Sequence, residues 1–326
     1  MYTLADNREV GKELRTAVVD ALKETMTVNS KVIALDADLG AASKWTDLKK
    51  THSEQFINVG ISEANMVGVA AGLNLTGYTP FIHTFGPFAT RRVLDQIYLS
   101  GAYSKNTINI FGSDPGFAAG HNGGTHTTWE DIALLRSIPE VVICDAADAV
   151  QMEWIIKEFS QRQGVHYVRG NRKGVRNVYS EQSTFELGKG NLLMTGEEYL
   201  IVAAGQLVSE ALEVAEYLNN QGISTDVIDM FTIKPLDKNL LLERFSGKKR
   251  VITIENHSII GGLGSAVAEV LAEDGSAIPL QRIGVNNRFG QVGTPEFLQE
   301  EFGLTTEKII DQIESETHVS QHLVHT

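Results

Sequence analysis

Short apolar runs alternate with longer amphipathic stretches through the first half of the chain. The apolar runs predict buried strands at 31–35, 107–111 and 140–144. Between and around them, apolar residues recur at helical spacing, which predicts helices over 11–25, 62–75, 87–103 and 149–161. Continuous apolar strands separated by amphipathic helices indicate a mainly parallel sheet that is covered by helices on both faces.

A polar, turn-rich stretch at 179–191 separates this unit from a second unit of the same kind. We interpret it as a linker between a domain of residues 1–178 and a domain of residues 192–326. A length of 326 residues also suits two domains. The second unit repeats the alternation, with expected strands at 199–203, 224–228 and 250–254 and expected helices at 209–221 and 262–272. The predicted fold is therefore α/β, with two doubly wound domains.

Composition narrows the class of function. The hydrophobic content of 42% is ample for buried cores. The formal net charge of −13 argues against a nucleic-acid binder, because no basic stripe offsets it. The nearest basic cluster, at 169–176, is either a solvated loop or a site for a small phosphate ester.

The cysteine content and the apolar runs of the chain indicate where the protein is located. Cys144 is the only cysteine, so no internal disulfide can form, and its apolar surroundings in sequence predict burial. A reducing compartment suits such a chain. The N-terminus is polar, and no apolar run has the length of a membrane span. We therefore expect a soluble cytoplasmic protein with neither nucleic-acid nor membrane partners.

Candidate chemistry begins at Glu63, the only acid in the apolar run 59–73, where a helix is expected to start. A carboxylate there can be stabilised by free backbone N–H groups and by the helix dipole. Dry surroundings can instead raise its affinity for a proton. Glu63 is thus either a helix-start acid or a catalytic one. Phe85 and Phe88 flank Pro87, which suits the first turn of a helix, and they are either core residues or rings for stacking.

The second unit carries a glycine-rich turn at 261–264. Such a turn before a helix can bind phosphate through backbone N–H groups. It lacks the full dinucleotide fingerprint, however, so tight packing between strand and helix is the favoured interpretation.

Four segments, in this order along the chain, resemble the transketolase family of thiamin diphosphate enzymes. They are Gly60-Ile61-Ser62-Glu63, Thr84-Phe85-Gly86-Pro87-Phe88, Gly123-Gly124-Thr125-His126 and 255–269. The resemblance covers nearly the whole chain. It implies a pyrimidine-binding domain followed by a transketolase C-terminal-like domain.

The resemblance also implies how a cofactor is bound. Glu63 corresponds to the glutamate that hydrogen-bonds the aminopyrimidine ring of thiamin diphosphate and promotes loss of the thiazolium proton. Phe85 and Phe88 correspond to residues that stack on that ring, and Asp38 to an acid near the cofactor at the dimer interface. Arg91 stands where a third aromatic residue is common, so we expect a pyrimidine pocket of altered shape.

For the substrate, the resemblance implies a second group of residues. His126 matches a histidine that faces the substrate and moves protons or binds hydroxyl groups. Asn122 stands where these enzymes have an aspartate that recognises a sugar hydroxyl. Arg15 matches an arginine that binds the substrate phosphate, and either Arg169 or Arg172 matches a second one.

One family motif is missing. The Gly-Asp-Gly segment and following Asn that hold Mg²⁺ and the diphosphate have no counterpart, and 112–114 comes nearest. We therefore expect no metal ligands from this chain, and Mg²⁺ bound through a partner. The expected partner is an N-terminal transketolase subunit carrying the diphosphate domain, with the pair self-associating into a heterotetramer. The pair would transfer a two-carbon ketol unit between sugar phosphates.

Two alternatives remain beside the split transketolase. The first is the β subunit of a 2-oxoacid dehydrogenase decarboxylase, which has a similar glutamate motif. The Gly-Gly-Thr-His motif and the run 131–136 look more like transketolase. The second is a non-catalytic subunit that only pairs with a partner, which the presence of Glu63 and His126 argues against.

Overall fold

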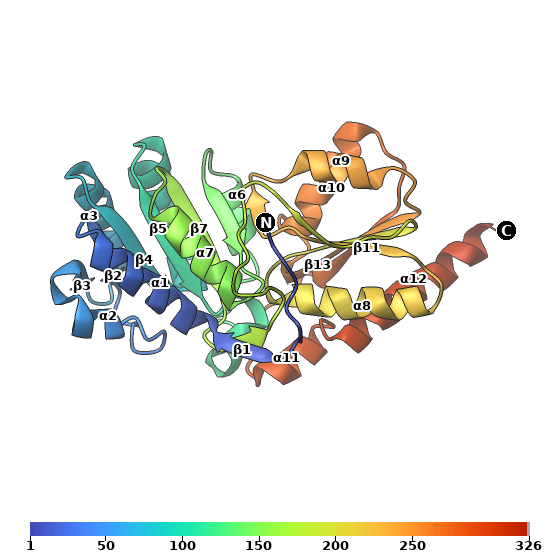
Figure 1. The fold of residues 1–326 in the computed structure, drawn as a ribbon, viewed down its shortest axis with the longest axis horizontal. Coiled ribbons are helices and arrows are strands. Elements are labelled where there is room, and N and C mark those ends of the chain that lie inside the picture. Colours follow the sequence, from blue (N-terminus) through green and yellow to red (C-terminus); the bar gives the residue numbers. More distant parts are fainter. Residues whose placement is uncertain (325–326) are drawn as a thin grey trace.

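The computed structural model describes residues 1–324, and its side chains are described through residue 316. The chain forms two α/β units side by side, each built around its own sheet (Figure 1). The first unit holds a seven-stranded sheet. In order across it, the strands are β12 (Thr232–Lys234), β6 (Val142–Asp145), β7 (Val165–Gly170), β5 (Ile108–Ser113), β4 (Thr79–Phe85), β2 (Val32–Asp36) and β3 (Phe56–Asn58). All neighbours are parallel except β12 and β6.

Helices cover both faces of this sheet, as the strand pattern predicts. They include α1 (Leu14–Val28), α2 (Asp47–Thr51), α3 (Glu63–Leu75), α6 (Asp131–Arg136) and α7 (Ala149–Phe159). Successive side chains of a strand point to opposite faces. Phe81 and Phe111 accordingly pack with α1 and α7, whereas Ile82 and Ile110 pack with α3 and α6. Each of the three predicted strands ends within two residues of its predicted bounds.

The prediction of one helix over 87–103 is wrong. The segment instead divides into α4 (Gly86–Ala89), a 3₁₀ turn (Arg91–Val93), α5 (Leu94–Gln96) and a π-helical stretch, η3 (Ile97–Tyr103). The break falls at Thr90, whose backbone leaves the helical region while its hydroxyl donates to the carbonyl of Gly86 at 2.8 Å. A threonine that bonds back to the preceding turn bends a helix. The bend determines where the two arginines that follow Thr90 point.

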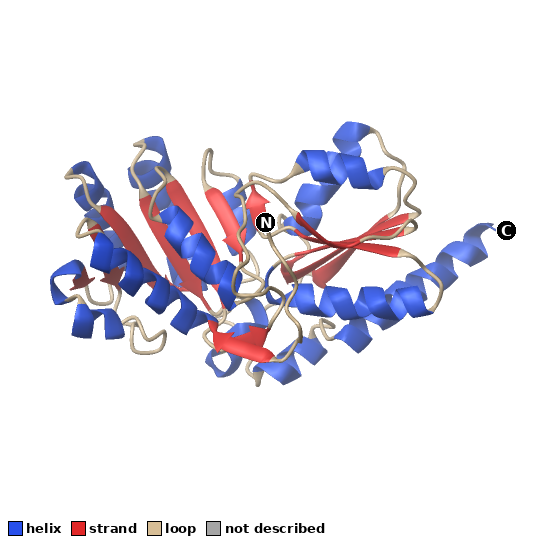
Figure 2. Ribbon diagram, in the orientation of Figure 1, coloured by secondary structure: helices blue, strands red, loops and turns tan. Residues whose placement is uncertain are grey.

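The second unit is a five-stranded sheet between two helix layers (Figure 2). Its strands, in order, are β14 (Leu280–Val285), β13 (Arg250–Ser258), β10 (Tyr199–Ala203), β11 (Thr225–Asp229) and β9 (Asn191–Met194). Its helices are α8 (Val208–Asn220), α9 (Lys238–Phe245), α10 (Leu263–Asp274), α11 (Pro295–Glu301) and α12 (Thr306–Val324). Side chains of α8 and α12 pack on one face, and those of α9 and α10 on the other.

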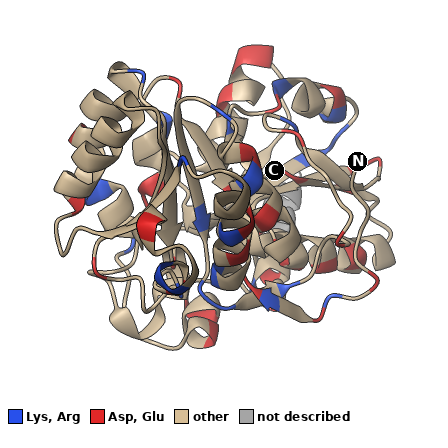
Figure 3. Cartoon of the chain, turned by 60° about the vertical axis from the view of Figure 1, so that its left-hand side comes forward, with Lys and Arg blue, Asp and Glu red and all other residues tan. Residues whose placement is uncertain are grey.

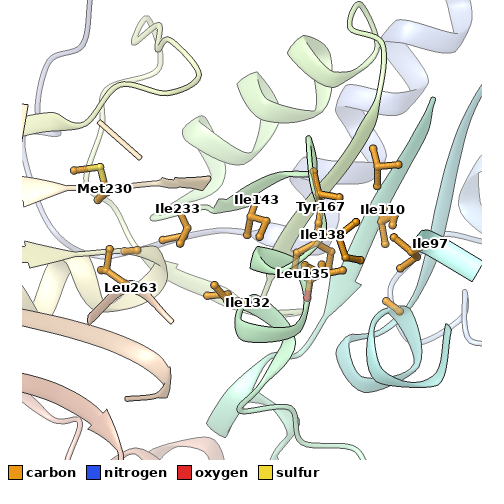
Figure 4. Packing of buried hydrophobic residues seen from close by; sticks show 14 of the residues in the cluster. Ile97, Ile110, Ile132, Leu135, Ile138, Ile143, Tyr167, Met230, Ile233 and Leu263 are labelled. Atoms are coloured by element: carbon orange, nitrogen blue, oxygen red, sulfur yellow. The ribbon is translucent and has the colours of Figure 1, made fainter. Parts of the chain in front are cut away.

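The two units are joined by a strand pairing and by a hydrophobic cluster that extends through both. Strand β12 follows β11 along the chain, yet it pairs with β6 of the first sheet. A single buried hydrophobic cluster also continues across the boundary, from Ile143 and Tyr167 to Met230, Ile233 and Leu263 (Figure 4). The linker at 179–191 stays a prediction. A small two-stranded sheet, β1 (Val10–Glu13) with β8 (Gly174–Arg176), completes the fold.

The distribution of charged residues and the burial of Cys144 agree with what the composition predicts. Lys and Arg are interspersed with Asp and Glu over both units in Figure 3, with no continuous basic stripe in that view. Cys144 is buried, as predicted. None of the helices in the described part of the chain is long and apolar enough to cross a membrane.

Candidate active site

Most of the candidate residues lie beyond the carboxyl ends of neighbouring parallel strands of the first sheet. Glu63 follows β3, Phe85 ends β4, His126 lies in the loop after β5, and Arg172 follows β7. The connection from β2 leads outward to β3, and the next one returns across β2 to β4. Ligands of open α/β sheets bind at such a reversal of strand order.

Glu63 is held at the first position of α3 by the turn that precedes it. Gly60 has a φ of 76°, which glycine tolerates, and its N–H donates to the side chain of Asn58 at 2.8 Å. The side chain of Ser62 bonds back to the carbonyl of Val59 at 2.8 Å. Glu63 is only 4% exposed, so its carboxylate is nearly removed from solvent. The predicted position of this acid at a helix start is confirmed.

Three rings form an aromatic surface near this carboxylate. The rings of Phe85 and Phe88 lie 6.2 Å apart between centroids, at 26°. The imidazole of His126 meets them edge-on, at 5.9 Å from Phe85 and 5.2 Å from Phe88. The hydroxyl of Thr125 contacts Nδ1 of His126 at 2.9 Å, which leaves Nε2 as the nitrogen that can face a ligand. The sequence motifs thus bring these three side chains together.

A cationic end adjoins the aromatic surface. The guanidinium carbon of Arg172 lies 5.1 Å from the centroid of Phe85, and its Nε pairs with the carboxylate of Asp114. Burial raises the pKa of Asp114, and the charge of Arg172 opposes that rise. Hydrogen bonding to Glu13 raises the pKa of Arg15, and the charge of Asp114 contributes to the same rise. Asp114 is therefore within electrostatic range of both arginines.

Two further predicted residues lie at the surface. Asp38 is exposed, in a left-handed conformation with a φ of 63°, and accepts a hydrogen bond from Asn58 at 3.1 Å. Because Asn58 also holds the turn before Glu63, Asp38 adjoins that turn. Asn122 is exposed at the end of the 3₁₀ segment η4 (Gly116–Asn122).

Arg169 lies in the interior, so it is not available to a substrate in this structure. Its side chain is fully buried, with Nε 3.0 Å from Asp131 and Nη1 3.5 Å from Asp145. Nη2 donates to the carbonyl of Asn256 in the second unit at 3.0 Å. Burial raises the pKa of Asp145 to about 6, although Arg169 opposes the shift. Of the two arginines left open by the sequence, Arg172 is the one beside the aromatic surface.

The basic cluster at 169–176 is not a single patch. Arg176 pairs with Glu210 and Glu213 of α8, while Arg169 points into the core. The phosphate-ester interpretation therefore applies at most to Arg172 and its neighbour Lys173. The spacing of these arginines does not show that each one forms ion pairs with acids from a different, distant segment.

The glycine-rich turn at 261–264 packs tightly, as predicted. The buried carboxylate of Glu255 accepts hydrogen bonds from the backbone N–H groups of Leu263 at 2.7 Å and Gly264 at 2.8 Å. A side chain at Gly262 would collide with the same carboxylate. The N–H groups that could have bound phosphate already have an internal acceptor.

Two residues of the site, Arg92 and Asp114, are not among those predicted from the sequence. Arg92 pairs with Glu63, and its guanidinium carbon lies 3.7 Å from the centroid of Phe88. Arg91, the expected departure from the family pattern, instead pairs with Glu130 at the surface. No sequence signal places Arg92 there, because the helix breaks at Thr90, between Phe88 and Arg92.

Family models match both units. The model described as transketolase, pyrimidine binding domain, matches residues 11–177, and the model described as transketolase, C-terminal domain, matches residues 188–309. The chain is 42% identical to the 6-deoxy-6-sulfo-D-fructose transketolase subunit SqwH of Clostridium sp. (strain MSTE9), over 91% of this chain and 92% of that one. It is 38% identical to the putative transketolase C-terminal section of Methanocaldococcus jannaschii, over 94% and 97%.

A solved structure and a longer relative also match this chain as one part of a transketolase. A split gene transketolase, described as an inactive beta4 tetramer, superposes with a TM-score of 0.85 and 40% identity, over 94% of this chain and 98% of that one. Human transketolase is 32% identical over 94% of this chain, but the match covers only 49% of the human protein. The matched region thus covers about half of a full-length transketolase and more than nine tenths of each shorter relative.

Proposed function

This chain belongs to the transketolase family, and we propose that it is the pyrimidine-binding subunit of a two-chain transketolase. It is a transferase subunit of the transketolase type, and family membership implies the use of thiamin diphosphate. The proposed partner is an N-terminal transketolase subunit that carries the diphosphate domain and Mg²⁺. The proposed assembly is a heterotetramer. The cytoplasmic setting expected from the sequence stays a prediction.

The near match in length to two short relatives supports the two-chain proposal. Both relatives are named as a subunit or a section of a transketolase, and this chain covers nearly all of each. Among the described residues, no group of three or more His, Cys, Asp and Glu side chains could hold a metal ion. In this proposal the partner supplies the ligands for Mg²⁺, which prefers hard oxygen donors.

One observation carries the proposed chemistry: the nearly buried carboxylate of Glu63 and the ring of Phe88, which stacks with Phe85, contact the same guanidinium group of Arg92. This arrangement fits the aminopyrimidine half of thiamin diphosphate, which offers a flat face for stacking and ring nitrogens for hydrogen bonding. When bound, the cofactor supplies a carbon nucleophile that carries the two-carbon ketol unit. Glu63 would hydrogen-bond the ring and exchange a proton with it, while Phe85 and Phe88 hold the ring in place.

The remaining residues would act on the substrate. His126 lies at the edge of both phenylalanine rings, so its free ring nitrogen can move a proton to or from a substrate hydroxyl. Arg172 and Arg15 would bind the anionic end of the sugar, because guanidinium groups bind phosphate bidentately and keep their charge. Asp38 and Asn122 stay candidates for the cofactor and substrate sides respectively.

His126→Ala is expected to lower turnover by about 10²-fold, the lower end of the range for general acid–base groups, with little change in cofactor affinity. The reason is that His126 would face the substrate while Glu63 and the phenylalanines hold the cofactor. Steady-state kinetics and calorimetric titration with thiamin diphosphate provide the comparison. His121→Ala, an exposed histidine of the same loop, is the matched control. Equal losses of turnover and cofactor affinity would make His126 a structural residue.

Arg15→Ala and Arg172→Ala are each expected to raise KM for phosphorylated donors by about 10- to 100-fold, the range of a charge-assisted hydrogen bond. KM for a non-phosphorylated ketol donor should change little, since it lacks the anionic end. The two donor types are compared in each variant, with Arg162→Ala, an exposed arginine before the start of β7, as control. Equal increases for both donors would assign the arginine to the fold or to an interface.

A donor screen with the partner present tests the proposal as a whole. The chain and its N-terminal subunit are combined, and ketol transfer from a panel of ketose phosphates is measured beside decarboxylation of 2-oxoacids. Ketol transfer alone is the expected result. Decarboxylation would favour the β subunit of a 2-oxoacid dehydrogenase, and no turnover with any donor would favour a non-catalytic pairing subunit. The transketolase names of the relatives support the first outcome.

A further inference from the structure

Arg92 has a partner on each side. Its Nη1 donates to the carboxylate of Glu63, and its guanidinium lies over the ring of Phe88, with 3.7 Å between Cζ and the ring centroid. The Glu63 side chain is 5% exposed, whereas that of Arg92 is 44% exposed. One flat cation therefore touches both the candidate proton-exchanging acid and one of the candidate stacking rings.

A guanidinium group resembles an aminopyrimidine in the features that this site can recognise. Both are flat, both direct N–H groups outward in their plane, and both stack on aromatic rings. Glu63 accepts the N–H of Arg92, and Phe88 packs on its face. A bound aminopyrimidine would use the same carboxylate and the same aromatic surface. Arg92 in this position and the cofactor ring therefore exclude each other.

We propose that Arg92 is a placeholder, which occupies the aminopyrimidine position before the cofactor binds and leaves it when the cofactor enters. This inference rests on the proposed function, because it requires Glu63 to bind the cofactor. A nearly buried carboxylate without a partner is costly, and Arg92 removes that cost in the empty site. The placeholder thus keeps Glu63 and Phe88 in position for the incoming ring.

The local backbone allows such an exchange. Arg92 lies in a short 3₁₀ turn immediately after the break at Thr90, not within a long helix. The neighbouring Arg91 pairs with Glu130, so the two arginines of the turn have separate partners. Because nearly half of the Arg92 side chain is already exposed, it can move to solvent without opening the core.

The placeholder must be displaced, so it should weaken cofactor binding. Arg92→Met keeps the unbranched stem but removes the charge and the donors. We expect this variant to bind thiamin diphosphate about 3- to 10-fold more tightly, a range reduced for the partial exposure of the pair. Arg91→Met is the matched control and should leave the affinity unchanged, because Arg91 contacts Glu130 instead of Glu63.

The test is calorimetric titration of thiamin diphosphate, with Mg²⁺ present, into the chain combined with its N-terminal subunit. Tighter binding by Arg92→Met, and loss of that gain in a Glu63→Gln background, are the expected results, because the effect acts through Glu63. Unchanged or weaker binding by Arg92→Met, with normal binding by the wild type, would overturn the placeholder alone. Failure of the wild-type pair to bind the cofactor would overturn the proposed function and the placeholder together.

Discussion

Glu63→Gln is expected to lower ketol-transfer turnover of the assembled enzyme by about 10²–10⁴-fold, while the fold and the assembly survive. Glutamine keeps the length and shape of glutamate but cannot exchange a proton with the cofactor ring. Glu63 itself is 4% exposed, so solvent is poorly placed to substitute for its carboxylate. No other acid follows in the apolar helix α3, where residues 64–75 are all uncharged.

Turnover of the variant is measured beside its thermal unfolding and its assembly with the partner. The unfolding measurement is needed because Glu63→Gln also removes the ion pair with Arg92. Glu54→Gln, at an exposed position in the 3₁₀ segment η1 (Ser53–Gln55), is the matched control and should behave as the wild type. Turnover within a few-fold of the wild type would remove Glu63 from the chemistry.

The second large effect concerns the chain by itself. We expect no measurable ketol transfer from the purified chain, even with thiamin diphosphate and Mg²⁺ in excess. Under the proposed function it contributes only the aminopyrimidine half of the site, and its match covers about half of a full-length transketolase.

The assay compares the chain alone, the N-terminal subunit alone, and the two combined at equal concentration. Activity should appear only in the mixture and should saturate as one subunit is titrated into the other. Sustained turnover by the chain alone would contradict the two-chain proposal. The protein concentration must be varied, so that weak association is not mistaken for inactivity.

Much of the fold followed from hydrophobic periodicity. Buried parallel strands are continuous apolar runs, so strands such as 199–203 could be located to the residue. Periodicity failed over 87–103, because the break depends on a hydrogen bond from the Thr90 hydroxyl. It also failed for β12, because pairing between distant strands depends on tertiary contacts that a local pattern does not contain.

The candidate site was predictable where a motif fixes both residue type and place. Glu63, the pair Phe85 and Phe88, and His126 come from three separate segments and lie together in the structure. The positions of the arginines were harder to predict, because their long side chains reach partners that sequence spacing does not reveal. Arg169 pairs inward with two buried aspartates, whereas Arg92, which no motif singles out, contacts the central carboxylate.

We propose that Glu63 of this chain acts on a cofactor whose diphosphate is held by another chain. Hydrogen–deuterium exchange at the thiazolium carbon of thiamin diphosphate tests it most directly, because it reports the proton transfer without any sugar substrate. Fast exchange is expected only when this chain and its N-terminal subunit are mixed, and slow exchange when the mixture contains Glu63→Gln. Fast exchange with either subunit alone, or undiminished exchange with Glu63→Gln, would contradict it.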